Sequence, residues 1–313
     1  MKKSIINTVT IALIAIVSLT FTACKKEKKQ AIPSLKIGAM SSLDYIPYVI
    51  AQKVGIYDSL GLNVEIIKFF SPNERDAAFR GGQVDGTVTD YTCATIQHAG
   101  GIPLAFVVKH DGFFEMMALP EITSMEELKG KNVGVSRNTV IEYSTDKMLE
   151  AFGMTEGDVN KPEVNKIPLR MEMMLAKELD VSIFPDPFIT LSKAKGFNSL
   201  CSTLDLDISV TGTIFTQDAI DNKGDAIKLL IEGYNLGVQY MMEHPRHEWA
   251  HILVEDAMIP EEFAETVVLP QYTKATVPSS KDIELTIEWL KKKELIPADY
   301  TGEGLVNPEF IPQ

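Results

Sequence analysis

The chain has 313 residues, of which 45% are hydrophobic and 23% are charged, and its formal net charge is −13. This length and apolar content allow two lobes of ordinary domain size, each with a packed core. The acidic balance argues against nucleic acid as a partner, because a protein that binds it must neutralise phosphates with clustered lysine and arginine.

The first residues predict export and a lipid anchor. Two lysines precede an apolar stretch from Ile11 to Val17, which is short for a membrane-spanning helix, and small residues then lead to Cys24. The pattern indicates a signal peptide over residues 1–23, and its end resembles a bacterial lipobox in which Cys24 is lipidated. Residues 24–34 are expected to be a lysine-rich tether. The alternative, an uncleaved N-terminal anchor, also leaves the protein outside the cytoplasm, on the periplasmic side or at the cell surface.

Beyond the tether, strand and helix patterns alternate in two similar series. The first predicts strands at 34–40, 62–70, 85–90 and 102–110, and helices at 45–55, 73–82 and 93–101. The second predicts strands at 131–136, 163–168 and 180–184, and helices at 138–153, 170–179 and 187–196. Such alternation implies parallel sheets with right-handed crossovers. The sequence therefore predicts an α/β protein with two lobes, each a mainly parallel sheet flanked by helices.

The order of these series also predicts where the chain passes between the lobes. The β-branched stretch 209–217 leads into long helical patterns that have no third sheet of their own. We therefore expect the chain to cross near Met117 and to return near Thr211, with the C-terminal helices packed on lobe one. Lobe one then comprises 35–117 and 210–313, and lobe two comprises 118–209. The two crossings form a hinge.

Polar and aromatic side chains follow the predicted strands at four strand-to-helix junctions. In open α/β sheets, ligands bind outside the carboxyl ends of the strands, where helix N-termini offer unpaired N–H groups. The candidate residues at these junctions are Asp44, Tyr45, Thr89, Asp90, Tyr91, Arg137, Asn138, Thr139, Glu142, Phe184 and Asp186. The alternative is that they are ordinary caps and turns, which favour several of the same residue types. As a set, they predict a ligand site in a cleft between the lobes.

Three stretches carry a resemblance to a known family: ERDAAFRGGQVDGTVTD, LKGKNVGVS and SIFPDPFITLSKAKG, in that order behind the lipobox. They resemble the solute-binding proteins of bacterial ABC importers for nitrate, sulfonates, taurine and the hydroxymethylpyrimidine precursor of thiamine. The resemblance covers essentially the whole mature chain. It implies the two-lobed, type II-like periplasmic-binding-protein fold, and an ABC permease with its ATPase as partners of a monomer. It also places at the ligand Tyr45, Thr89, Asp90, Asn138, Thr139, Glu142, Phe184 and Asp186, with less support for Arg137.

The charge of the ligand is an open question at this point. Arg137 beside a helix N-terminus is suited to a sulfonate or nitrate. The four candidate carboxylates would instead repel a small anion, whereas they accept hydrogen bonds from N–H groups, and the candidate aromatic rings offer stacking surfaces. We therefore expect a neutral or weakly basic heteroaromatic solute of the thiamine-pyrimidine type, with a sulfonate- or nitrate-type anion as the alternative.

Two enzymatic readings compete with solute binding. The sequence HEWAH at 247–251 matches H-E-x-x-H, in which His247 and His251 would bind zinc and Glu248 would act as general base. No third residue that could bind zinc follows HEWAH at the spacing that zinc hydrolases use. A pyrimidine synthase like some eukaryotic relatives would need a lysine and a histidine in the cleft groups, and neither is there. We therefore expect no catalysis, no cofactor and no metal. The distant Cys93 and Cys201 are expected to be buried side chains without a disulfide.

Overall fold

The computed structural model describes residues 33–40 and 42–312. Pro33–Gln313 forms one compact unit. The predicted signal peptide at 1–23 and the lipidation site Cys24 lie outside the described residues. Within the described part, none of the helices has the length and apolar character needed to cross a membrane.

The first sheet has five strands in the order β2-β1-β3-β9-β4. β1 pairs in parallel with β2 and β3, whereas β9 runs antiparallel to β3 and β4. The strands are β1 (Ser34–Met40), β2 (Asn63–Phe69), β3 (Gly86–Asp90), β4 (Leu104–Lys109) and β9 (Thr211–Thr216). We call the part of the unit built around this sheet lobe one.

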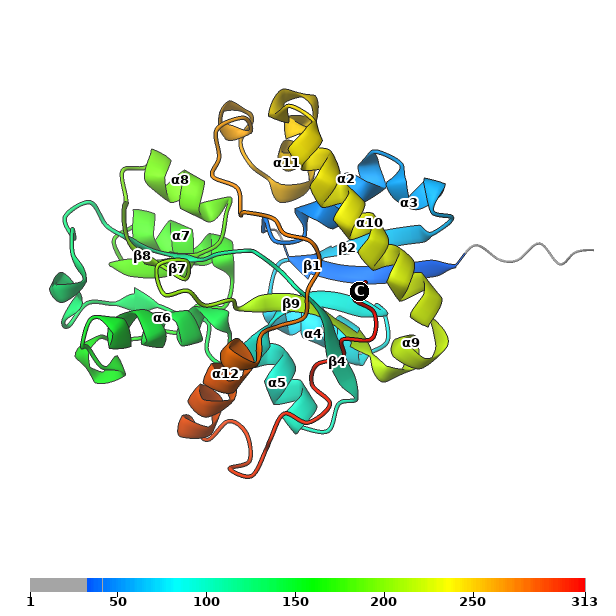
Figure 1. The fold of residues 1–313 in the computed structure, drawn as a ribbon. Helices are drawn as coiled ribbons and strands as arrows, with labels where there is room; N and C mark the ends of the chain where they lie inside the picture. The colour runs from blue at the N-terminus through cyan, green and yellow to red at the C-terminus, as the bar shows by residue number, and fades with distance from the viewer. Residues whose placement is uncertain (1–32, 41, 313) are drawn as a thin grey trace, which may run out of the picture. The chain divides into compact units, whose positions relative to one another are not determined.

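The helices of lobe one start where the sequence provides caps. Ser71 accepts a hydrogen bond from the Glu74 N–H group at the start of α4, and Pro72 occupies the first helical position. The helices are α2 (Ile46–Lys53), α3 (Ile56–Ser59), α4 (Pro72–Arg80), α5 (Tyr91–Ala99), α9 (Gln217–Asn222), α10 (Gly224–Glu243), α11 (Ala250–Ala257) and α12 (Ser280–Lys292). α10 approaches α2 so closely that a Cβ atom on Gly237 would lie 2.4 Å from the Pro47 carbonyl oxygen. Figure 1 shows α2, α3 and α10 together on lobe one.

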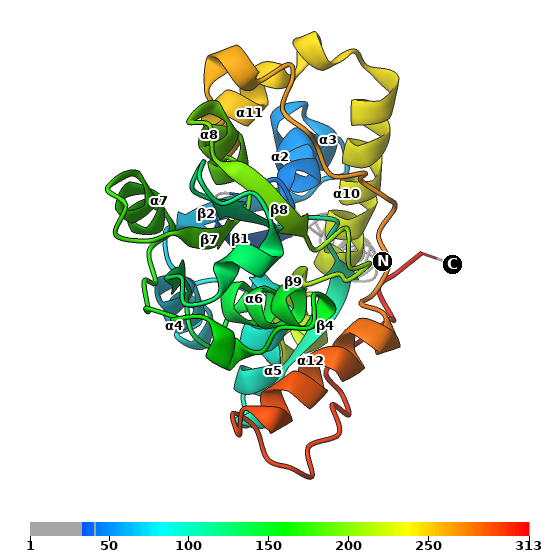
Figure 2. The same cartoon turned by 90° about the vertical axis from the view of Figure 1, so that its left-hand side faces the viewer.

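The second sheet has four strands in the order β6-β7-β5-β8. β6 and β7 are parallel, and β5 is antiparallel to β7 and β8. The elements of this part, lobe two, are β5 (Glu115–Ala118), β6 (Val133–Gly134), β7 (Val181–Phe184), β8 (Asn198–Ser202), α6 (Val140–Ala151), α7 (Ile167–Leu175) and α8 (Phe188–Ala194). Figure 2 views this lobe from its own side. Short 3₁₀ turns at Met125–Leu128 and Glu156–Asp158 complete it.

The strand that we predicted at 163–168 is absent. Only isolated bridges form there, between Asn132 and Asn160 and between Val135 and Glu163. Proline has no N–H group to donate to a ladder. Pro162 and Pro168 frame this stretch, and Pro168 lies in the first turn of α7. The segment therefore runs beside β6 without becoming a full strand.

The chain passes between the lobes in the segments 110–114 and 203–210. Met117, where we expected the first crossing, lies inside β5 of the second sheet, so the crossing comes a few residues earlier. The two segments are tied to each other, because Phe114 N–H donates to Thr203 Oγ1 (3.1 Å) and Thr203 N–H donates to the Phe114 carbonyl (2.9 Å). The strands that follow the crossings, β5 and β9, are the reversed strand of each sheet. Both sheets are thus mixed.

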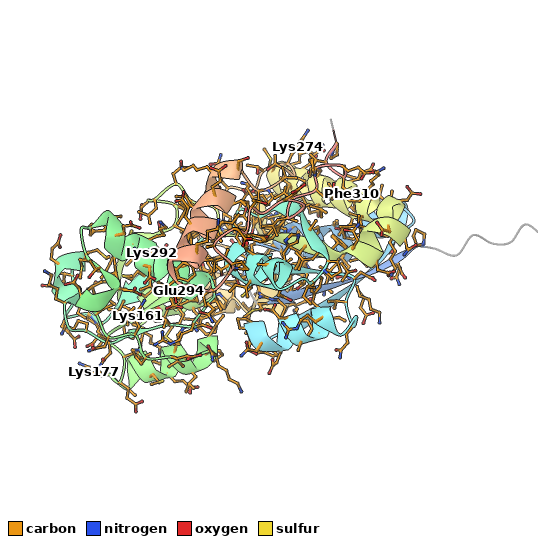
Figure 3. All side chains as sticks on the ribbon, turned by 90° about the horizontal axis from the view of Figure 1, so that it is seen from below. Lys161, Lys177, Lys274, Lys292, Glu294 and Phe310 are labelled. Carbon is orange, nitrogen blue, oxygen red and sulfur yellow. The ribbon has the colours of Figure 1, made fainter. Side chains whose placement is uncertain are left out.

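α12 packs on α5 of lobe one and also reaches lobe two. Trp289 Nε1 donates to Asp146 Oδ2 (3.0 Å), and Lys293 Nζ lies 3.0 Å from the same carboxylate. Figure 1 places α12 beside α5 and α6, and Figure 3 labels Lys292 at the end of this helix and Lys161 on lobe two nearby. The C-terminal helix therefore bridges the two lobes.

Candidate functional site

A cavity of about 60 Å³ lies between the lobes. We call it the interlobe cavity. Its residues from lobe one include Met40, Ser42, Asp44, Arg75, Thr89 and Asp90. Its residues from lobe two include Ser136, Thr139, Asn165, Ile167, Arg170 and Pro185, while Phe114 comes from the first crossing and Thr211 from the start of β9. A single water needs ~10–15 Å³ on this scale, so the cavity has room for a small solute.

The end of β3 positions the polar side chains on the lobe-one side. Asp90 caps α5 by accepting a hydrogen bond from Cys93 N–H (2.8 Å), and Thr92 Oγ1 also donates to this carboxylate. Thr89 is buried, and among the described residues its hydroxyl has no hydrogen-bond partner. A buried hydroxyl without a partner is costly, so this group is suited to a bound solute.

Arg75 lies against the same carboxylates. Its Nε donates to Asp76 Oδ1 (2.8 Å), and its Nη2 lies 3.7 Å from Asp90 Oδ2. Burial alone would lower the pKa of Arg75, but the nearby carboxylates of Asp76 and Asp90 outweigh it and raise the pKa above its usual value. The charge of Arg75 is therefore compensated within lobe one.

The turn before α6 positions the polar side chains on the lobe-two side. Thr139 Oγ1 donates to the Ser136 carbonyl (2.8 Å) and accepts from Ile141 N–H (3.2 Å), which caps α6. Ser136 Oγ donates to Asn165 Oδ1 (2.9 Å). Asn138 adopts φ 60°, a left-handed conformation that asparagine tolerates better than most residues. Ser136 and Thr139 therefore line the cavity, whereas Asn138, which we predicted at the site, is exposed and does not line it.

Arg170 is the charged residue on this side of the cavity. It extends from α7, and its Nη1 donates to the Val164 carbonyl (2.9 Å). Its guanidinium lies over the Phe184 ring at 5.6 Å from the centroid. Burial lowers the pKa of Arg170 to about 9, so the group is still a cation at neutral pH. Sequence reasoning missed it because RMEMML is typical of an amphipathic helix, although an arginine among methionines is itself a signal.

Four of the residues predicted from the sequence line the interlobe cavity, namely Asp44, Thr89, Asp90 and Thr139. The three predicted aromatic residues are core residues. Tyr45 and Tyr91 are buried in lobe one, where Tyr45 Oη donates to the Asp256 carbonyl (2.7 Å) and the Tyr91 ring packs edge-on against Phe106. Phe184 belongs to the core of lobe two. Large rings next to a sheet end bury more apolar area inside the lobe than at its surface, which accounts for this placement.

Arg137 and Glu142 do not line the cavity. Arg137 is half-exposed and lies 3.5 Å from Glu163 and 3.7 Å from Glu142. Glu142 accepts a hydrogen bond from Asn138 N–H (2.8 Å). It is buried and also faces Lys161 at 3.5 Å. These residues stabilise the start of α6 instead of facing a solute.

Asp186 lines a second, smaller cavity that shares Asp44 and Phe114 with the first. It accepts hydrogen bonds from Thr190 N–H (2.9 Å) and Thr190 Oγ1 (2.6 Å), so it caps α8. Burial raises its pKa. Asp186 therefore lies beside the interlobe cavity without lining it.

The HEWAH sequence does not form the motif that zinc hydrolases use. Arg246–Glu248 is a short 3₁₀ turn and α11 begins only at Ala250, so His247 and His251 are not one turn apart on one helix. Both are exposed. Across residues 33–40 and 42–312, no three histidine, cysteine or acidic side chains are grouped as metal ligands. Cys93 and Cys201 are both buried and free.

The sequence of the chain matches a family model. The model described as NMT1/THI5 like matches residues 42–248. The chain belongs to the NMT1/THI5-like family. The matched region contains most of lobe one's sheet, all of lobe two and both crossings. No curated protein matches the chain in sequence.

Solved structures share the architecture of this NMT1/THI5-like protein. The ligand-binding component of an ABC-type import system from Staphylococcus aureus, solved with zinc bound, has a TM-score of 0.74 at 16% identity and covers 89% of this chain and 97% of its own. The alkanesulfonate-binding protein SsuA from Xanthomonas axonopodis pv. citri, bound to MOPS, has a TM-score of 0.75 at 15% identity. The match covers 88% of this chain and 98% of its own. The periplasmic nitrate-binding protein NrtA from Synechocystis PCC 6803 has a TM-score of 0.68 at 15% identity, and the match covers 86% of this chain and 83% of its own. The two-lobed periplasmic-binding-protein fold predicted from the sequence is confirmed.

Proposed function

We propose that this protein is an extracytoplasmic solute-binding protein. It captures a small organic solute in the interlobe cavity and delivers it to an ABC permease and its ATPase. The observation that carries the proposal is the cavity itself, to which both lobes contribute buried polar side chains such as Asp44, Thr139 and Arg170. The ligand-binding component of an ABC-type import system and the alkanesulfonate-binding protein among the similar structures support it.

The mechanism is binding and closure. A solute that contacts both lobes binds the closed form more tightly than the open form, because neither lobe alone offers all of the contacts. We propose that the two lobes rotate about the segments 110–114 and 203–210. The sequence prediction gave lobe one as 35–117 with 210–313 and lobe two as 118–209. A lipid on Cys24, the first residue of the tether 24–34 that follows the signal peptide 1–23, would keep the monomer at the membrane surface, where the permease lies.

The proposal assigns no catalysis. A pyrimidine synthase that uses a lysine-bound cofactor needs a lysine at the site, and the described lining of the interlobe cavity contains neither lysine nor histidine. The lining residues bind and orient a solute without an activated nucleophile.

The ligand expected from the sequence is a thiamine-type pyrimidine. Asp44 and Asp90 support such a compound, because carboxylates accept hydrogen bonds from amino and ring N–H groups. The buried tyrosines no longer support it, since Tyr45 and Tyr91 offer no stacking surface to the cavity. The alternative, an anion of the sulfonate or nitrate type, is supported by Arg170.

The experiment is thermal unfolding of Pro33–Gln313 with hydroxymethylpyrimidine, thiamine, taurine, alkanesulfonates and nitrate. A solute at about a hundred times its Kd adds ~2.7 kcal/mol of stability, which raises Tm by a few degrees. Asp44→Asn, inside the cavity, should weaken the shift, and the exposed Asp58→Asn serves as the matched control. A solute that shifts Tm equally in parent and Asp44→Asn would contradict the proposed site.

A further inference from the structure

Arg170 is a fully buried cation that has no counter-charge among residues 33–40 and 42–312. Its exposure is 0%, and its Nε and Nη2 have no hydrogen-bond partner within the described chain. Among the same residues no carboxylate lies within ion-pair distance of its guanidinium, and its one hydrogen bond goes to the neutral Val164 carbonyl. Buried charges are normally paired, so the remaining donors of Arg170 are free for a partner that the described residues do not supply.

The other arginine of the interlobe cavity shows the usual arrangement. Arg75 is equally buried, but it has Asp76 at 2.8 Å and Asp90 at 3.7 Å. The contrast matters because both guanidinium groups line the same cavity. Only the lobe-two group lacks an anion among the described residues.

The charges of the cavity are therefore unequal on its two sides. The charged lining residues of lobe one are Asp44, Asp90 and Arg75, which gives two carboxylates and one guanidinium. The described lining residues of lobe two include one charged side chain, Arg170. The side chain of Asp44 accepts from Ser42 Oγ but has no cationic partner in the described residues. One side thus has excess negative charge and the other has excess positive charge.

We infer that the solute is amphoteric, with an acidic group bound by Arg170 and an N–H-bearing basic group facing Asp44 and Asp90. This inference rests on the proposed solute-binding function and names the chemical class of the solute. An acidic group with two oxygens matches the planar donor fork of a guanidinium, whether it is a carboxylate, a sulfonate or a phosphonate. A bipolar solute would bridge the lobes by charge, and closure would then bury both of its ends.

A second arginine provides a matched control. Arg246 also donates to one backbone carbonyl, that of Glu265 (3.0 Å), and lies over an aromatic ring, that of Trp249 at 5.8 Å. It differs in being only half-buried and in lying outside the interlobe cavity. Replacing Arg246 therefore removes a similar packed guanidinium without touching the proposed site.

The experiment measures Kd by calorimetry for matched compounds on Pro33–Gln313. The set comprises ω-amino carboxylates, sulfonates and phosphonates of two to four carbons, their uncharged amides, the corresponding acids without the amino group, and hydroxymethylpyrimidine. The parent protein should bind at least one amphoteric compound at least tenfold more tightly than its amide and its deaminated acid. In Arg170→Met, the ratio of the Kd of the amide to the Kd of the acid should fall at least tenfold relative to the parent. In Arg246→Met, this ratio should stay as in the parent.

The outcomes separate the inference from the proposed function. Equal affinity of the parent for acids and amides would overturn the inference, and so would an unchanged preference in Arg170→Met. Binding of hydroxymethylpyrimidine without any acid would overturn the inference and leave the solute-binding function intact. If no compound in the set binds, the inference is overturned, while the solute-binding function is still decided by the thermal-shift series, which includes thiamine and nitrate. Should Arg170→Met fail to fold, the preference of the parent protein for acid over amide decides the matter by itself.

Discussion

Asp90 has two functions that substitution can separate. Its carboxylate caps α5 through Cys93 N–H at 2.8 Å, and it faces Arg75 at 3.7 Å. Asp90→Ala removes both interactions. Loss of an N-cap costs ~1 kcal/mol. The ion pair has a gross Coulomb energy of about 4 kcal/mol at an effective dielectric constant of 20, most of which is offset by desolvation.

The net loss from the weakened pair is ~1–2 kcal/mol, because Arg75 still has Asp76 at 2.8 Å. Asp90→Ala should therefore lower the free energy of unfolding by ~2–3 kcal/mol in total. Asp90→Asn retains an oxygen acceptor for the cap and should lose only ~1–2 kcal/mol. Both variants should bind the solute more weakly than the parent.

The assay is urea unfolding followed by circular dichroism, combined with the thermal shift given by the solute. Thr216→Ala is the control, since Thr216 caps α9 by accepting from Ala219 N–H (3.1 Å) but lies outside the interlobe cavity. It should lose ~1 kcal/mol and retain full affinity. If Asp90→Ala were as stable as the parent, or if Asp90→Asn were less stable than Asp90→Ala, the reasoning about cap and charge would be refuted.

Two further predictions concern packing and pH. Gly237→Ala would place a Cβ 2.4 Å from the Pro47 carbonyl and should cost ~2–3 kcal/mol in urea unfolding, whereas Gly224→Ala meets nothing closer than 3.5 Å and should be close to neutral. Equal stability of the two variants would contradict the close approach of α10 to α2. The hydrogen bond from Lys293 is the largest factor that lowers the pKa of Glu156 to about 2. A lowered carboxyl pKa adds stability above the unfolded value of ~4.3 that is lost as the pH falls towards 2. Because this carboxylate is half-exposed, the effect should stay below ~1 kcal/mol, and the slope of stability between pH 4.5 and 2 should be shallower in Lys293→Met than in the parent. Identical slopes would show that the contact contributes nothing in solution.

Local signals were sufficient for the framework of the fold. Ser71 caps α4 three residues before Glu74, and the predicted strands of the first series correspond to β1, β2, β3 and β4. In lobe two only β6 and β7 were predicted, whereas β5 and β8 were not. Asp90 and Thr139 reach the cavity because each caps a helix at the end of a strand-to-helix junction. These features depend on residues that are close in the sequence.

The features that sequence reasoning missed depend on contacts between distant segments. Tyr45 and Tyr91 follow strands as ligand residues do, yet packing turns both rings into the core of lobe one. Arg75 and Arg170 are in segments correctly assigned to helices, but no local pattern shows that both are buried at the same cavity. The cavity is lined by Arg170 and not by Arg137, the less supported candidate from the sequence, and this is why we propose an amphoteric solute instead of a neutral or weakly basic one.

A crystal structure of Pro33–Gln313 with the solute that raises Tm most tests the central claim most directly. The account predicts that the solute lies in the interlobe cavity within hydrogen-bond distance of side chains from both lobes, including Asp44 or Asp90 from lobe one and Thr139 or Arg170 from lobe two. A solute bound to one lobe alone, or at a place outside this cavity, would contradict the proposal that the protein captures its ligand by closing two lobes around it.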